Sequence, residues 1–187
     1  MNNSDTIFIC YRHSKDDNIA DRVKDWLERY GYDVYFDKNT YRLGNKGLTE
    51  RTNQIARCTD FLLFLSKSTF RKRLFFKRRT DWVIKEVETA LGQHNLRNKG
   101  KVNIILILYP EGVEMPTNIP SEISVISEFP AVHYCNIHDG HYRIFIQDII
   151  AKLNSHPTYI PYGHEIATMT KQYNIEEAIA QNRWKFI

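Results

Sequence analysis

Short apolar runs alternate with amphipathic stretches along this chain. The run at 6–11 (TIFICY) is continuous, rich in β-branched side chains and of strand length, which is typical of a strand buried on both faces. By the same criteria the sequence predicts five strands, at 6–11, 33–36, 61–65, 102–108 and 132–135. Runs of this kind are expected in a parallel sheet covered by helices.

Apolar residues recur at helical spacing between the predicted strands. A Ser14–Asp17 segment resembles a capping box, and the helix after it ends at Gly31. Further helices are predicted at about 48–57, 81–91 and 142–153, with an irregular segment at 37–47 and a proline-punctuated loop at 110–130. Alternating strands and helices predict an α/β fold: a flavodoxin-like, doubly wound parallel sheet of five strands in the order 2-1-3-4-5.

The predicted elements form one domain at residues 1–155. A linker that contains Pro157 and Pro161 then leads into a C-terminal extension, residues 156–187. Asn174 and the acidic residues after it could cap a short final helix that ends near Trp184. We therefore expect a single globular domain followed by a short appendage.

Composition indicates the compartment. The chain has 187 residues and is 42% hydrophobic, yet no apolar run approaches the roughly 20 residues that span a bilayer. Residues 1–5 have neither the basic nor the apolar region of a secretory signal. Three unpatterned cysteines, Cys10, Cys58 and Cys135, favour buried free thiols in a reducing environment. We expect a cytoplasmic protein without a membrane partner.

The net charge of +4 is concentrated in one segment. Residues 71–79 hold six Lys or Arg side chains, and the remainder of the chain is mildly acidic. Phe75 and Phe76 lie among these charges, an arrangement that could serve nucleic-acid or membrane binding. A solvated surface loop is the simpler interpretation, so we do not expect nucleic acid to be a partner.

One predicted helix, 81–91, combines an apolar stripe with a carboxylate at its edge. Trp82 and Glu86 are four residues apart and share the flank of that stripe, whereas Glu88 points nearly opposite, toward solvent. A carboxylate stacked over an indole in a half-apolar setting is a candidate for chemistry. The alternative is that Glu86 is an ordinary boundary charge.

Three other motifs do not match the common sites that they resemble. The spacing of His133, Cys135, His138 and His141 matches no common zinc pattern, so no metal is expected. Gly44–Gly47 lacks the ending of a phosphate-binding P-loop. A phosphoacceptor receiver domain has the same strand order but needs an acidic cluster after the first strand, where this chain has Tyr11-Arg12-His13.

Five segments together resemble a TIR (Toll/interleukin-1 receptor) domain. They are Ile7–Arg12, Gly31–Asp37, Leu43-Gly44, Ile55–Ser66 and Asp81–Leu91. The first resembles the family's opening strand, and the last resembles the helix that bears the catalytic glutamate of its NAD-cleaving branch. The resemblance covers about residues 5–155, with the elements in the family's order.

The resemblance implies a role for each matching position. Glu86 would be the catalytic carboxylate and Trp82 its neighbour over the pocket. The other binding residues would be Arg12 and His13, near the nucleotide, and Asp37, Leu43 and Gly44, in the loop that closes on the substrate. Two positions depart from the family: Cys10 replaces a serine, which we interpret as a packing change, and Leu48 is nearest to the site of a missing aromatic.

The implied activity is cleavage of NAD⁺ at the nicotinamide–ribose bond by a glycohydrolase or cyclase. NAD⁺ would be the substrate, and no cofactor is expected. The family also implies homo-oligomers in which one subunit's loop closes over Glu86 of another. A free-standing TIR enzyme with an extension resembles the signal-producing component of Thoeris-type anti-phage systems, whose product a separate effector reads. A non-catalytic adaptor, or an effector that interferes with host TIR signalling, remains the alternative.

Overall fold

The computed structural model of this chain describes residues 6–12, 17–36, 45–70, 81–96, 102–110, 112–134 and 139–155. Five strands occur within them: β1 (Thr6–Cys10), β2 (Asp33–Phe36), β3 (Asp60–Leu65), β4 (Asn103–Leu108) and β5 (Ala131–His133). They form one sheet in the order β2-β1-β3-β4-β5, and every neighbouring pair is parallel. The predicted strand order and fold class are confirmed.

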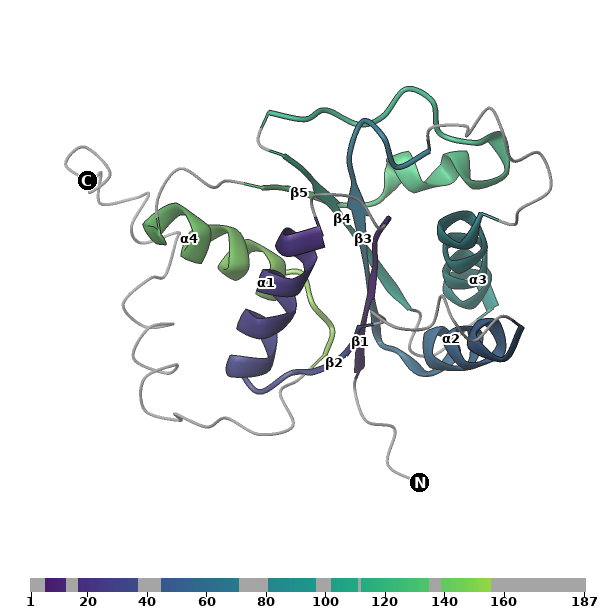
Figure 1. Cartoon of the computed structure of the whole chain (residues 1–187), viewed down its shortest axis with the longest axis horizontal. Coiled ribbons are helices and arrows are strands. Elements are labelled where there is room, and N and C mark those ends of the chain that lie inside the picture. The colour runs from purple at the N-terminus through teal and green to yellow at the C-terminus, as the bar shows by residue number, and fades with distance from the viewer. Residues whose placement is uncertain are drawn as a thin grey trace.

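Helices cover both faces of the sheet. α1 (Asp17–Arg29) and α4 (Asp139–Ile150) lie on one face, while α2 (Asn45–Arg57), α3 (Trp82–Leu96) and the 3₁₀ helix η2 (Ser121–Glu128) lie on the other (Figure 1). None of the helices in the described residues is long and apolar enough to cross a bilayer. The arrangement is the three-layer sandwich that alternating elements predict.

Successive side chains of a buried strand point to opposite faces of the sheet, so the core consists of two layers. On β1, Ile7 and Ile9 join the cluster under α1 and α4, whereas Phe8 and Cys10 join the cluster under α2 and α3. Cys10 is fully buried. The last residue of β1 therefore directs its thiol toward the layer that holds the candidate glutamate.

Several element bounds differ from the prediction by a few residues. α2 begins at Asn45, three residues before the predicted start at Leu48, so Gly47 lies inside its first turn. A glycine costs a helix only about 1 kcal/mol, which does not suffice to end one. α4 spans Asp139–Ile150 and therefore lies three residues earlier than predicted at both ends.

The predicted proline-rich loop contains a helix. η2 occupies Ser121–Glu128, directly after Pro120, and buries Ile123 and Ile126 against α3. A proline fixes φ near the helical value and is tolerated before the first turn of a helix. Pro120 is therefore compatible with a helix that begins at the next residue. The predicted short helix near Trp184 lies outside the described residues, as does the whole C-terminal extension.

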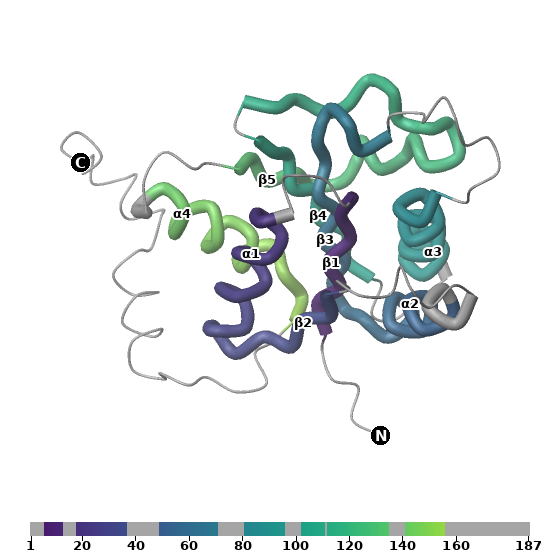
Figure 2. Tube along the Cα trace, in the orientation of Figure 1, coloured from purple at the N-terminus to yellow at the C-terminus, as the bar shows by residue number. Residues whose placement is uncertain are grey.

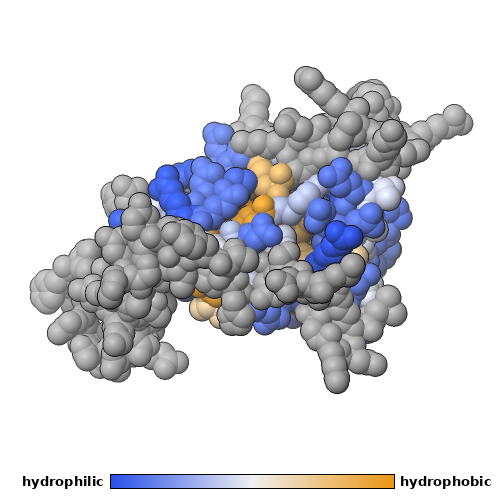
Figure 3. Space-filling view, turned by 90° about the horizontal axis from the view of Figure 1, so that it is seen from below, coloured by the Kyte–Doolittle hydropathy of each residue, from blue (hydrophilic) through white to orange (hydrophobic). Residues whose placement is uncertain are grey.

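The segment after α4 returns to the amino end of the sheet (Figure 2). There the backbone N–H groups of Asn154 and Ser155 donate to the Asp60 carboxylate, each at 2.7 Å. Seen from below, the described surface is mainly hydrophilic, with a narrow hydrophobic strip between two hydrophilic areas (Figure 3). The candidate site lies toward the other edge, where the strands end.

Candidate functional site

Glu86 is buried on the inner face of α3. Its side chain is 9% exposed, and its neighbours Val83, Val87 and Ala90 are core residues. Glu88, two residues on, is 33% exposed and accepts a hydrogen bond from Lys85 at 2.6 Å. The helical pattern therefore separated the two glutamates correctly, and only Glu86 lies in an environment that could alter its chemistry.

Arg51 of α2 is the ionic partner of Glu86. Its Nη1 lies 3.0 Å from Glu86 Oε1, and the two side chains are 8% and 9% exposed. The same guanidinium lies over the Trp82 ring, with Cζ 5.5 Å from the ring centroid. Trp82 and Glu86 thus share one flank of α3, as predicted, and Arg51 contacts both from the neighbouring helix.

Arg51 is not among the residues that the sequence predicted for the site. The sequence contains a signal for it: Arg51 and Ile55 lie at helical spacing on the buried face of α2, and the buried Cys58 follows directly after the helix. An arginine on such a face needs a buried anion or hydrogen-bond acceptor. Only the fold could show that this acceptor is Glu86, which is 35 residues away.

Cys10 borders the carboxylate from the side of the sheet. Burial raises the pKa of the Cys10 thiol well above its ordinary value, and the charge of Glu86 and a hydrogen bond to it raise that pKa further. Arg12 and Arg51 act in the opposite direction but more weakly. Cys10 is therefore a neutral thiol that donates to Glu86, while the packing change that the sequence suggested stays a prediction.

Arg12 ties the end of β1 to the start of α3. Its guanidinium donates to the Thr69 carbonyl oxygen and to Asp81 Oδ2. The other carboxylate oxygen of Asp81 accepts the backbone N–H of Val83 at 3.2 Å, the usual geometry of a helix N-cap. Arg12 therefore contacts the residue that caps the glutamate's helix, while its role as a nucleotide ligand stays a prediction.

The other predicted binding residues, His13, Asp37, Leu43 and Gly44, lie outside the described residues. The same is true of the basic segment 71–79 and of Cys135 and His138. Within the part of the chain that the structure describes, no group of three His, Cys, Asp or Glu side chains could hold a metal ion. The described part of the candidate site consists of Glu86, Arg51, Trp82, Cys10 and the Arg12–Asp81 pair.

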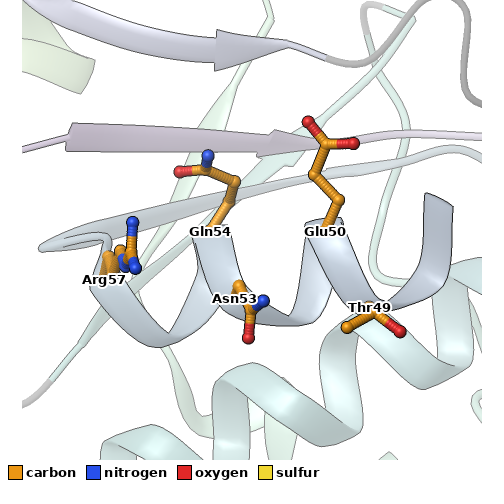
Figure 4. Close-up of a pocket in the computed structure, with 5 residues that line it drawn as sticks. All are labelled: Thr49, Glu50, Asn53, Gln54 and Arg57. Atoms are coloured by element: carbon orange, nitrogen blue, oxygen red, sulfur yellow. The ribbon is translucent and has the colours of Figure 1, made fainter. Parts of the chain in front are cut away.

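A separate hollow of about 470 Å³ lies along the outer side of α2 (Figure 4). Its lining comes from successive turns of that helix: Thr49, Glu50, Asn53, Gln54 and Arg57. None of the candidate-site residues lines it. Arg51 belongs to the buried face of α2, so this polar hollow and the Glu86 cluster are distinct features of the described residues.

The cluster has the properties of an electrostatic site. A carboxylate is held in a fixed position by a cation, with a partly exposed indole beside it, where β1 ends and α3 begins. Ligands of doubly wound sheets bind outside the carboxyl ends of the strands. A buried, preorganised negative charge can stabilise positive charge that develops on a bound substrate. Fold and site thus define a flavodoxin-like α/β domain with one candidate catalytic carboxylate.

Comparison with known proteins identifies the family. The family model of the TIR domain matches residues 7–144, so this chain belongs to the TIR domain family. It is 27% identical over 132 residues to NAD(+) hydrolase SARM1 of Danio rerio, and 29% identical over 136 residues to NAD(+) hydrolase tir-1 of Caenorhabditis elegans. These matches cover 68% and 71% of this chain but only 17% and 13% of the relatives.

Solved structures include a similar domain. The SEFIR domain of IL-17 receptor B superposes with a TM-score of 0.46 at 10% identity, covering 79% of this chain and 98% of that domain.

Proposed function

We propose that this chain cleaves NAD⁺ at the nicotinamide–ribose bond, with Glu86 as the catalytic carboxylate. The observation that supports this most directly is the buried Glu86 beside Trp82, fixed by Arg51 near the end of β1. The choice of substrate is supported by the two relatives, both named NAD(+) hydrolases. Because the chain matches only a small part of each relative, the activity is tested on this chain itself.

The chemistry explains why one carboxylate suffices. Ordinary glycosidases need two, one of which protonates the leaving oxygen. The nicotinamide ring of NAD⁺ is already cationic, so the C–N bond breaks with both electrons going to the ring nitrogen, and nicotinamide leaves uncharged. Positive charge then develops on the ribose, and Glu86 stabilises it. Water adds to the anomeric carbon and loses a proton, which yields ADP-ribose; attack by another nucleophile yields a cyclic isomer or a conjugate.

The decisive experiment measures nicotinamide release from NAD⁺ by the purified protein at high concentration. Glu86→Gln keeps the shape of the side chain but removes its charge, and should lower the rate about a hundredfold or more. Glu88→Gln is the matched control, since it makes the same change on the exposed side of the same helix and should leave the rate unchanged. Equal rates in wild type and Glu86→Gln would contradict the proposal.

We also propose that the active form is a homo-oligomer, in which the 37–47 segment of one subunit closes over Glu86 of a neighbour. Specific activity should then fall on dilution and recover when a fused oligomerisation domain holds subunits together. If forced oligomers assemble but leave NAD⁺ intact, the chain functions instead as a non-catalytic adaptor.

The biological context concerns the product of the reaction and the protein that responds to it. We propose that the product is an ADP-ribose-derived signal, formed in the cytoplasm and read by a separate effector during bacterial anti-phage defence. Mass spectrometry of the product separates hydrolysis from conjugation, and chromatography against standards separates isomers. Cells that carry the wild-type chain with its effector should resist phage, and cells with Glu86→Gln should not. An effector of host TIR signalling would give no such protection.

A further inference from the structure

The Arg51–Glu86 pair raises a question that the proposed function leaves open. A carboxylate that is 9% exposed would ordinarily give up its charge, because burial penalises the ionised form. The proposed chemistry requires that charge, since a neutral acid stabilises a developing cation poorly. Something in the site must therefore offset the cost of burial.

Arg51 is a cation in direct contact with Glu86. Its Nη1 lies 3.0 Å from Oε1, whereas the Arg12 guanidinium is bonded to Asp81 and to Thr69. Cys10 donates a hydrogen bond as a neutral thiol. Lys85, on the same helix as Glu86, is paired with Glu88 on the exposed side. An opposite charge at hydrogen-bonding distance strongly favours an ionised carboxylate.

Arg51 is also well placed to fix the direction of the carboxylate. Its guanidinium stacks over Trp82 and is itself 8% exposed, so it has little freedom to move. Trp82 and Glu86 lie one turn apart on α3, and Arg51 reaches both from α2. The planar guanidinium therefore couples the orientation of the carboxylate to the indole beside it.

We propose that Arg51 is a positioning residue for the proposed NAD⁺ cleavage: it keeps Glu86 ionised inside the fold and holds its carboxylate against the Trp82 ring. This inference rests on the proposed function of Glu86. Arg51 acts through Glu86 and contacts no substrate. Its loss should therefore change the pH at which the enzyme works, whereas a purely structural role would lower activity equally at every pH.

The main test compares pH profiles of kcat/KM for NAD⁺. Arg51→Met keeps the unbranched stem of the side chain but removes the guanidinium and its charge, and should move the acidic limb of the profile upward by about one pH unit or more. Arg51→Lys restores a positive charge and should return the limb toward wild type, with a lower kcat because the fork geometry is lost. Arg57→Met, on the exposed side of the same helix, should leave the profile unchanged.

A second readout needs no catalysis. The carboxyl carbon of Glu86, labelled with ¹³C and assigned with Glu86→Gln, reports its ionisation directly by NMR. Its titration midpoint should lie at higher pH in Arg51→Met than in wild type. If wild type releases no nicotinamide under any condition, the proposed function fails, and the NMR midpoints alone still decide whether Arg51 holds the charge.

The outcomes are distinct. Activity lost equally at all pH values, with an unchanged NMR midpoint in a folded variant, would overturn the proposal and leave Arg51 a structural residue. If Arg51→Met does not fold, Arg51→Lys and Arg51→Gln are compared instead. A profile shift in Gln but not in Lys supports the proposal, and identical profiles in both contradict it.

Discussion

Asp60 and Glu86 are both buried carboxylates of this domain, but they lie at opposite ends of the sheet and are held differently. Asp60 begins β3 and is fully buried. Its donors are neutral: the Asn103 amide at 2.8 Å, the Thr59 hydroxyl at 3.0 Å, and the backbone N–H groups of Asn154 and Ser155 at 2.7 Å. The Ser155 hydroxyl donates as well, at 2.5 Å.

Glu86 lies instead near the last residue of β1 and is held by a guanidinium and a thiol. The donors to Asp60 come from the residue before β3, from β4 and from the segment after α4. The hydrogen bonds of Asp60 therefore join distant parts of the chain. The contacts of Glu86 join α2, α3 and β1 beside an indole that is partly exposed. The difference teaches that burial alone does not mark a candidate functional carboxylate, and that its donors and its edge of the sheet have to be considered as well.

The largest effect on stability should come from removing the Asp60 carboxylate and the hydrogen bonds that it accepts. Asp60→Ala leaves several buried donors without an acceptor, and the free energy of unfolding should fall by about 3 kcal/mol or more. Asp33→Ala is the matched control, because Asp33 is the exposed first residue of the edge strand β2 and accepts a longer hydrogen bond, from Thr6 at 3.2 Å. It should change stability by only about 0.5 kcal/mol.

Urea unfolding measures both variants, and the comparison with Glu86 supplies the second half of the test. Folded Asp60→Ala should keep its NAD⁺ cleavage per folded molecule, whereas Glu86→Gln should lose cleavage while remaining folded. If Asp60→Ala were as stable as wild type, the contrast between a structural and a functional carboxylate would not hold.

A smaller change in stability should distinguish two possible roles of Arg12, contact with the Asp81 cap of α3 and direct contact with the nucleotide. If Arg12 acts through the Asp81 cap of α3, then Arg12→Gln and Asp81→Ala should each cost about 1 kcal/mol of stability, and the double variant should cost little more than either one. We expect this non-additivity because the two side chains are bonded to each other. A rise in KM for NAD⁺ that is confined to Arg12→Gln would instead favour direct contact with the nucleotide.

Much of this fold can be predicted from local patterns. β2 was predicted at its observed bounds, the alternation of elements predicts the parallel sheet, and the predicted strand order is the observed one. Helical periodicity also predicts Glu86 at the edge of the apolar stripe and Glu88 nearly opposite, toward solvent; their side chains are 9% and 33% exposed. The η2 helix was missed because prolines indicate a break but not the conformation of the residues after it. Arg51 was missed because its partner is defined by the packing of α2 on α3, which no local pattern encodes.

The smallest effect at neutral pH concerns the thiol beside Glu86, because this effect develops only as the pH rises. Because the pKa of Cys10 is raised in the folded state, the unfolded chain loses this proton first as the pH rises. The corresponding stability is fully present below the ordinary thiol pKa of about 8.5 and is lost progressively above it. Wild type should therefore lose up to about 1.4 kcal/mol per pH unit relative to Cys10→Ala in that window.

Urea unfolding of both proteins between neutral and alkaline pH measures this difference. The comparison cancels the tyrosines Tyr30, Tyr32 and Tyr142, whose pKa values burial also raises. Burial is the main cause at Cys10 and the charge of Glu86 the next, so the pH dependence should persist in a Glu86→Gln background and end at lower pH. If the pH dependence is identical with Glu86 and with Gln at this position, the carboxylate does not affect the pKa of the Cys10 thiol. Of Arg51 and Cys10, only Arg51 would then interact with the charge of Glu86.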